Sequence, residues 1–245
     1  MKISFVVPCF NAESVIEKKI LKLKNWMSKL KGIKYEIILI DDGSKDNTLN
    51  ILKKLKFKDI KVISNPKNLG KSISLIKGIN RAIYKKIIIW DCDLPYFSCL
   101  NKIIISLKYN NFVYINRRSK KSKLQSTNLS IYQLTRLIIS RIVCRIINYI
   151  LIGKYIGDTQ AGLKGFDKPK NFEKINFLSK KFFLDAELMI LFYKSKMKMK
   201  SIHLRYRIYE NSTIKIFDFT NFVYLTELFK LIFVYNIKKI KKLKI

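Results

Sequence analysis

Over the first 115 residues, short runs of β-branched and other apolar residues alternate with longer segments whose apolar positions recur every three or four residues. Continuous apolar runs are typical of strands buried on both faces, and the wider spacing is typical of helices that bury one face. The alternation predicts an α/β fold in which helices flank a mainly parallel central sheet. The predicted strands are 3–8, 35–40, 60–64, 87–90 and 112–115, and the predicted helices are 13–30, 47–55, 71–84 and 98–108.

Longer segments follow residue 116. A polar, basic loop is expected over 117–127 and a helix over 129–152, whose apolar face is interrupted by Arg136, Arg141 and Arg145. Such a helix fits either a bilayer surface or a protein core from which the arginines reach solvent. The remaining predicted elements are a loop and short strand over 158–166, a helix over 183–193, a strand over 201–206 and a basic amphipathic helix from 217 to 245. We expect one domain over 1–215 and a C-terminal helical segment over 216–245, packed on that domain or lying at a membrane surface.

The composition is typical of a protein that folds. We expect this protein to be cytoplasmic. Of the 245 residues, 49% are hydrophobic and 13% aromatic, which excludes wholesale disorder. No stretch of about 18 residues is free of charge, and the opening apolar run stops at Pro8, too early for a signal peptide. The four cysteines lack paired spacing, so we expect reduced thiols.

The charge balance is strongly basic. Lys and Arg number 50 against 17 Asp and Glu, a net charge of +33, which favours polyanionic partners such as nucleic acid, anionic lipid or nucleotide-linked substrates. Only 8 of the basic residues are Arg, so biased base composition of the gene explains the excess equally well. The lysines are spread along the chain and no nucleic-acid recognition motif is present, so we expect no specific nucleic-acid partner.

Acidic residues follow two of the predicted strands directly. Asp41 and Asp42 end one strand, and Asp91 and Asp93 end another. Because the carboxyl ends of parallel strands meet at one edge of a sheet, these carboxylates are expected at the same edge, where open α/β sheets bind ligands. Two carboxylates one residue apart suit Mg²⁺ or Mn²⁺, which would neutralise a diphosphate leaving group, although the same pattern also occurs in ordinary solvated turns.

Four segments, in order, resemble family 2 glycosyltransferases of the GT-A fold. They are VVPCFNAE at 6–13, DDGS at 41–44, NLGK at 68–71 and DCDL at 91–94. Two later segments, DTQAGLKGF at 158–166 and FLDAEL at 183–188, are similar to a narrower branch, the polyprenyl-phosphate (dolichyl-phosphate type) sugar transferases. The resemblance covers roughly residues 3–215. It implies a Rossmann-like nucleotide-binding half joined to an acceptor half.

The resemblance also implies roles for individual residues. The donor would be a UDP- or GDP-linked hexose, and Asp91 and Asp93 would bind Mg²⁺ or Mn²⁺. The implied nucleotide-sugar contacts are Pro8, Asn11, Glu13, Asp42, Lys71, Asp91, Cys92, Asp93 and Gln160. Asp158 and Asp185 would line the sugar and acceptor side as the catalytic carboxylates. The chain departs from many relatives at Pro95, where they carry a metal-contacting Gln.

The chemistry of the acceptor decides whether a base is needed. A phosphate monoester is largely dianionic near neutrality and attacks without one, whereas a sugar hydroxyl would have to give its proton to Asp158 or Asp185. Arg117, Arg118 and Arg205 either hold an acceptor phosphate or are surface charges of a basic protein.

Taken together, the residues and the resemblance predict an inverting, metal-dependent transfer of a hexose to a polyprenyl phosphate. The enzyme would lie peripherally on the cytoplasmic face of an anionic membrane. The alternatives are a family 2 transferase acting on the hydroxyl of a glycan or capsular saccharide, a degenerate non-catalytic homologue, and a nucleic-acid binder.

Overall fold

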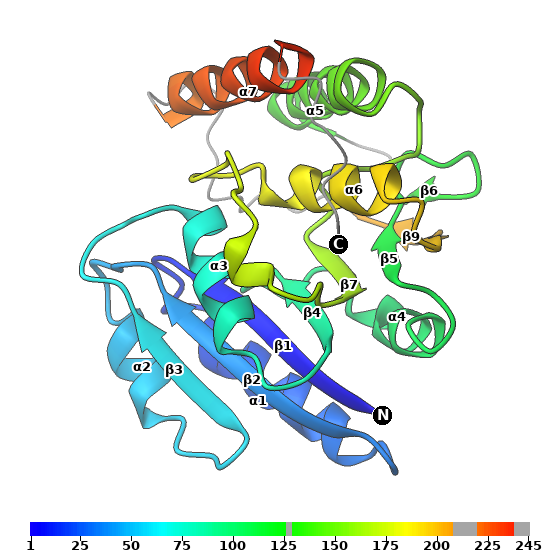
Figure 1. Ribbon diagram of the computed structural model, residues 1–245. Coiled ribbons are helices and arrows are strands. Elements are labelled where there is room, and N and C mark those ends of the chain that lie inside the picture. Colours follow the sequence, from blue (N-terminus) through cyan, green and yellow to red (C-terminus); the bar gives the residue numbers. More distant parts are fainter. Residues whose placement is uncertain (126–128, 208–219, 238–245) are drawn as a thin grey trace.

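A computed structural model describes residues 1–125, 129–207 and 220–237 (Figure 1). Its centre is a seven-stranded sheet in the order β3-β2-β1-β4-β7-β5-β8. The strands of this sheet are β1 (Lys2–Cys9), β2 (Lys34–Asp41), β3 (Ile60–Ser64), β4 (Lys86–Trp90), β5 (Phe112–Ile115), β7 (Leu163–Asp167) and β8 (Met199–Ile202). A second, two-stranded sheet pairs β6 (Lys123–Leu124) with β9 (Arg205–Tyr206).

The central sheet is mainly parallel, as predicted. Strand β1 pairs in parallel with β2 and β4, β2 with β3, and β5 with β8, whereas β7 runs antiparallel to both of its neighbours. The register places Cys9 beside Asp41 and Trp90 beside Leu163. The carboxyl ends of β1, β2 and β4 therefore share one edge of the sheet with the beginning of β7, and the acidic strand ends meet there.

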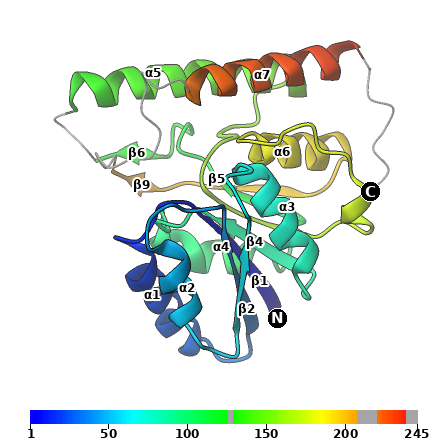
Figure 2. The same cartoon turned by 90° about the vertical axis from the view of Figure 1, so that its left-hand side faces the viewer.

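Helices cover both faces of the sheet (Figures 1 and 2). One face packs against α1 (Ile16–Ser28), α2 (Thr48–Lys54) and α4 (Leu100–Ser106), the last preceded by the short turn η1 (Phe97–Cys99). The other face packs against α3 (Lys71–Arg81) and α6 (Leu184–Lys194), and a further short turn, η3 (Phe172–Lys174), lies beside it. The spacing of Ile16, Ile20, Leu23 and Met27 puts all four on the buried side of α1, which is why periodicity predicted this helix.

A third layer lies beyond α6 in both views (Figures 1 and 2). It consists of α5 (Ile131–Ile146), which continues as the π-helical segment η2 (Ile147–Ile152), and α7 (Thr220–Ile237). Ser130 and Gln133 form a capping box that fixes the start of α5. The segment η2 ends at Gly153, whose φ of 84° suits glycine. Buried residues of η2 and α7, including Leu151, Leu228 and Leu231, pack on α6.

The third layer exposes large apolar side chains. On α5 they recur at helical spacing, beginning with Ile131, which is 86% exposed, and on α7 they include Phe229, which is 68% exposed. Members of this apolar surface are Ile131, Leu134, Ile138, Ile139, Ile142, Tyr149, Ile150, Leu225, Phe229 and Phe233. The core-helix interpretation of 129–152 is therefore wrong for the face that carries Ile131 to Ile142. Within the described residues no helix is both long and apolar enough to cross a membrane.

Two further predictions need correction. The single strand predicted over 201–206 is two strands in different sheets, because β8 pairs with β5 and β9 pairs with β6. The loop predicted over 117–127 contains the short strand β6, which pairs in parallel with β9. Lys238, Lys239, Lys241, Lys242 and Lys244, the basic end of the predicted terminal helix, lie outside the described residues.

Candidate active site

The loops after β1 and β2 are joined by hydrogen bonds at the carboxyl edge of the sheet. Asn11 accepts from the Lys45 amide at 2.9 Å, and its own amide donates to the Ser44 hydroxyl at 3.0 Å. The Glu13 carboxylate accepts from the Asn47 amide at 2.8 Å. Asn11 and Glu13 thus hold these two loops together at the edge of the sheet. Pro8 is buried within β1.

Asp42 is buried and organises the turn that leads into α3. Its carboxylate accepts from the amides of Leu69 at 3.0 Å and Gly70 at 2.9 Å, and from the Asn65 side chain at 2.8 Å. Gly70 has a φ of 108°, and a β-carbon there would lie 2.7 Å from the Lys180 carbonyl oxygen, so only glycine fits. Asp42 therefore fixes the backbone from which Lys71 extends.

Lys71 lies at the centre of a cluster of four charged groups, of which Asp185 and Lys164 are buried. Its Nζ is 2.7 Å from Asp91 Oδ1 and 2.9 Å from Asp185 Oδ2. The other oxygen of Asp185 binds Lys164 Nζ at 2.9 Å, and this ammonium also donates to the Ala161 carbonyl at 2.6 Å. Burial opposes ionisation of Asp185, but the two lysines outweigh it and hold its pKa below the usual value. Asp185 is thus a fully paired carboxylate.

The acidic turn after β4 has one partly buried and one exposed carboxylate. The Asp91 amide donates to the Gly162 carbonyl at 3.0 Å, and a β-carbon on Gly162 would lie only 1.8 Å from Asp91 Oδ2. Asp93 is exposed, yet partial burial and the neighbouring Asp91 raise its pKa. Between them, Cys92 is held as a neutral thiol, because burial and then Asp93 and Asp91 raise its pKa to about 12.

Asp91 and Asp93 fit a divalent ion that takes its other ligands from a diphosphate, since Mg²⁺ is commonly held by one or two carboxylates and phosphate oxygens. The Lys71 ammonium against Asp91 shows that this carboxylate already attracts a cation. In the described parts of the chain, no three His, Cys, Asp or Glu side chains gather closely enough to hold a metal unaided. Bound there, the ion would stabilise the leaving diphosphate.

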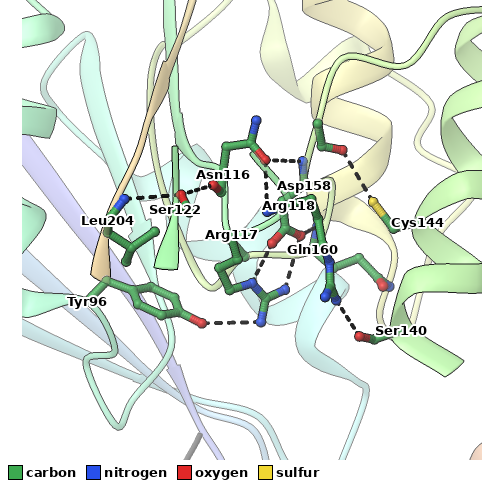
Figure 3. A network of polar contacts seen from close by, with 12 residues as sticks. Tyr96, Asn116, Arg117, Arg118, Ser122, Ser140, Cys144, Asp158, Gln160 and Leu204 are labelled. Carbon is green, nitrogen blue, oxygen red and sulfur yellow. Dashed lines mark hydrogen bonds and ion pairs between the residues drawn. The ribbon is translucent and has the colours of Figure 1, made fainter. Parts of the chain in front are cut away.

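A second ion pair lies at the end of β5 (Figure 3). Arg117 binds Asp158 through two parallel contacts, Nε to Oδ2 and Nη2 to Oδ1, the second at 3.0 Å. Its third nitrogen, Nη1, donates to the Tyr96 hydroxyl at 3.2 Å. Burial alone would raise the pKa of Asp158, but the guanidinium outweighs it and lowers that pKa. Asp158 also accepts from the Gln160 amide at 3.1 Å, so both of its oxygens are engaged.

Arg118 extends from the same loop towards α5 (Figure 3). One of its terminal nitrogens binds the Ser140 hydroxyl, while its Nε is buried without a hydrogen-bond partner in the described structure. Arg136, four residues before Ser140 on α5, likewise has a buried Nη1 without a partner there. Buried donors are normally satisfied, which makes these two arginines candidates for binding an anion.

A loop between η3 and α6 connects the third layer to the site. The Glu227 carboxylate, on α7, accepts from the amides of Lys180, Lys181 and Phe182 at 2.6 to 2.8 Å. On the other side of this loop, the carbonyls of Lys181 and Lys180 accept from the first amides of α3, Ser72 at 3.1 Å and Ile73 at 3.2 Å. The start of α3, which carries Lys71, is therefore braced by α7.

Most of the predicted site residues meet at this edge, in three groups. Asn11, Glu13 and Asp42 form the first, Lys71, Asp91 and Asp185 the second, and Arg117, Asp158 and Gln160 the third. Arg205 differs, because it is exposed on β9 and makes no hydrogen bond or ion pair with the other predicted site residues where the chain is described.

Sequence reasoning missed Lys164, Tyr96, Arg136 and Glu227. Only Lys164 carried a usable signal, as a lysine inside the apolar strand segment LKGF, where a buried charge needs a partner. Arg136 was visible only as an arginine that interrupts an apolar helix face. Tyr96 and Glu227 are ordinary in sequence and become informative only through the contacts described above.

Comparisons with known proteins show which family this sequence is similar to. The family model described as "Glycosyl transferase family 2" matches residues 4–169. A dolichyl-phosphate beta-glucosyltransferase of Trichomonas vaginalis is 27% identical over 236 residues, covering 87% of this chain and 68% of that protein. A prophage bactoprenol glucosyl transferase homolog of Escherichia coli is 41% identical over 96 residues, covering 38% of this chain and 31% of that protein. The chain thus spans about two thirds of the first relative and less than a third of the second.

Among solved structures, the fold resembles that of glucosyl-3-phosphoglycerate synthase from Mycobacterium tuberculosis, crystallised with Mn²⁺, uridine diphosphate and phosphoglyceric acid. The TM-score is 0.66 at 14% identity, and the match covers 97% of this chain and 78% of that chain. At this identity the likeness concerns the fold alone, and it confirms the predicted GT-A architecture.

Replacing Lys164 by Met should destabilise the protein. Lys164 is 0% exposed, and among the described residues its loss leaves Asp185 paired with Lys71 alone, so we expect the free energy of unfolding to fall by about 3 kcal/mol. Urea denaturation of the wild type and the variant measures this difference. The exposed Lys53→Met serves as control, and a Lys164→Met variant as stable as that control would contradict the importance of the buried pair.

Proposed function

Because the chain belongs to glycosyl transferase family 2, we propose that it moves a hexose from a nucleotide diphosphate sugar to a polyprenyl phosphate. The observation that carries this proposal is the juxtaposition of Lys71, Asp91 and Asp185 at the carboxyl edge of the sheet. Lys71 and a divalent ion on Asp91 and Asp93 would supply the positive charge that stabilises a departing nucleoside diphosphate. Asn11, Glu13 and Asp42 would shape the pocket for the nucleoside.

The state of the two candidate bases favours a phosphate acceptor. Asp158 is held by Arg117 and the Gln160 amide, and Asp185 is held by Lys71 and Lys164, so each carboxylate is paired with a cation. Such low-pKa carboxylates are poor bases for a sugar hydroxyl. A phosphate monoester needs no base, since its second pKa is about 6. The reaction would then be a single displacement that inverts the anomeric carbon, with these carboxylates positioning the cationic side chains.

Arg118 and Arg136 are the residues best suited to hold the acceptor phosphate. Each has a buried N–H without a partner in the described structure, and Arg118 binds Ser140, which lies one helical turn after Arg136 on α5. Guanidinium groups bind phosphate oxygens through charge-assisted hydrogen bonds. Arg117, by contrast, already binds Asp158 and Tyr96, so it would position these two side chains and would not hold the phosphate.

The apolar surface of α5, η2 and α7 would bring the enzyme to its lipid acceptor. Its exposed Ile, Leu and Phe side chains are accompanied by the exposed basic residues Arg141, Arg145 and Lys230. An apolar face with basic neighbours is complementary to a bilayer that contains anionic lipid. We assign this surface to the cytoplasmic face of such a membrane. The dolichyl-phosphate and bactoprenol names of the relatives support the same kind of acceptor.

The Asp93→Asn variant should lose sugar transfer while remaining folded. Asp93 is exposed, so its replacement leaves packing intact, but it removes a charge from the proposed metal site, and turnover should fall by roughly 100-fold or more. The assay offers a short polyprenyl phosphate with a panel of nucleotide sugars and detects the lipid-linked sugar.

The exposed Glu173→Gln variant makes the same change in charge away from the site and should retain full activity. Product formed only on saccharides would reject the lipid acceptor, and an unaffected Asp93→Asn rate would point to a different site or a non-catalytic chain.

Arg136→Met should weaken acceptor use without weakening donor binding. Loss of a charge-assisted contact to phosphate should raise KM for the polyprenyl phosphate by about 10-fold. Steady-state kinetics with varied acceptor, together with UDP binding measured by calorimetry, separate the two effects. Arg81→Met, on the far end of α3, is the control, and equal KM values in both variants would remove Arg136 from the acceptor site.

The paired substitution Ile138→Asp and Phe229→Asp should abolish vesicle binding. Burial of such side chains contributes about 1.5 to 3 kcal/mol each, so the partition coefficient should fall by about 100-fold to 10,000-fold. Sedimentation with phosphatidylcholine vesicles, with and without phosphatidylglycerol, measures the partition. Ile83→Asp alters an isoleucine that is 63% exposed outside the third layer and should bind like the wild type. Equal binding by all three proteins would assign the apolar surface to another partner.

A further inference from the structure

The Lys71 ammonium occupies the oxygen through which Asp91 would bind a divalent ion. We propose that Lys71 competes with the metal for Asp91 and transfers to the donor diphosphate when the metal binds. This inference rests on the proposed donor site. It adds that Lys71 and the metal ion compete for Asp91, which couples metal binding to donor binding.

The two oxygens of Asp91 are not equivalent. Oδ2 faces the start of β7, where Gly162 is so close that a β-carbon would lie 1.8 Å away. Oδ1 is the oxygen that Lys71 Nζ contacts at 2.7 Å. Mg²⁺ binds a carboxylate oxygen at about 2.0 to 2.1 Å, and two cations so close on one oxygen repel each other strongly. Lys71 and a metal ion therefore exclude each other at Oδ1.

Departure of Lys71 leaves no buried carboxylate unpaired. Asp185 keeps Lys164, which is fully buried and 2.9 Å from its Oδ1, while Asp91 gains the metal ion. An uncompensated buried charge is what makes breaking such a pair costly, and here every carboxylate stays compensated. Lys164 thus lowers the cost of displacing Lys71, because Asp185 keeps one cation throughout.

The backbone of Lys71 need not move. Gly70, the residue before it, is held by Asp42, and the next two amides are held by the carbonyls of Lys180 and Lys181. The change is confined to a four-carbon side chain, whose ammonium can rotate from the carboxylates to a nearby anion. Lys71 therefore has a mobile ammonium group on a fixed backbone.

The diphosphate is the anion that would receive Lys71, because it is ligated by the same metal ion. In the unloaded site Lys71 neutralises Asp91, and in the loaded site the metal neutralises Asp91 while Lys71 binds a phosphate oxygen. Metal and nucleotide then bind cooperatively through Lys71, in addition to their direct contact. Linkage requires this coupling to be the same in whichever order the two ligands bind.

Mn²⁺ titration of the whole protein, followed by the electron paramagnetic resonance of free Mn²⁺, tests this coupling with and without UDP. In Lys71→Met, Mn²⁺ alone should bind about 10-fold tighter than in the wild type, because its competitor is gone. The gain in Mn²⁺ affinity on adding UDP should shrink by a similar factor. Lys71→Arg keeps the competing charge and should bind Mn²⁺ alone like the wild type.

Lys67→Met is the matched control, because it removes the same charge from an exposed position four residues away. If Lys71→Met binds Mn²⁺ alone no tighter than Lys67→Met does, or retains the full UDP effect, Lys71 is not the competitor. In that case, tight Mn²⁺ and UDP binding by the wild type would contradict only the competitor role of Lys71 and would still support the proposed function. If the wild type binds neither Mn²⁺ nor UDP, both the competitor role and the proposed donor site fail.

Discussion

The shared carboxylate of Asp185 is the interaction on which the site depends. It binds Lys164 through one oxygen and Lys71 through the other, and Lys71 in turn contacts Asp91. The cluster joins α6, β7, α3 and the end of β4, which are far apart in sequence. A buried charge is tolerated only when it is paired, so the ionised side chains assemble here into a cluster in which each carboxylate has a cation. The same charges that hold these elements together are available to the chemistry of the edge.

A second constraint connects this edge to the outer layer of helices. Glu227 holds three successive amides of the loop before α6, and the carbonyls of that loop hold the first amides of α3. The helix that carries exposed Leu225 and Phe229 is therefore linked, through one loop, to the helix that carries Lys71. If the proposed lipid acceptor is correct, this arrangement would keep the proposed membrane-facing layer in a fixed position relative to the proposed donor site.

The candidate site could be located from sequence, but the roles of its members could not. Acidic strand ends at Asp42, Asp91 and Asp93, together with the later segments around Asp158 and Asp185, predicted the edge of the sheet at which these side chains gather. The sequence does not show that Arg117 neutralises Asp158 or that two lysines share Asp185, because these pairs join residues 41, 114 and 21 positions apart. The same carboxylates therefore look like bases in the sequence and are paired anions in the structure.

The sequence by itself determined the α/β class, the order of its main strands and helices, and its kinship with family 2. These follow from local periodicity and from short motifs, which depend on neighbouring residues. Tertiary structure alone decided that β7 runs antiparallel, that 201–206 divides between two sheets and that the apolar face of α5 is exposed. Each of these outcomes depends on which distant segment comes alongside. A hydrophobic pattern shows that a face is apolar, but only packing decides whether protein covers it.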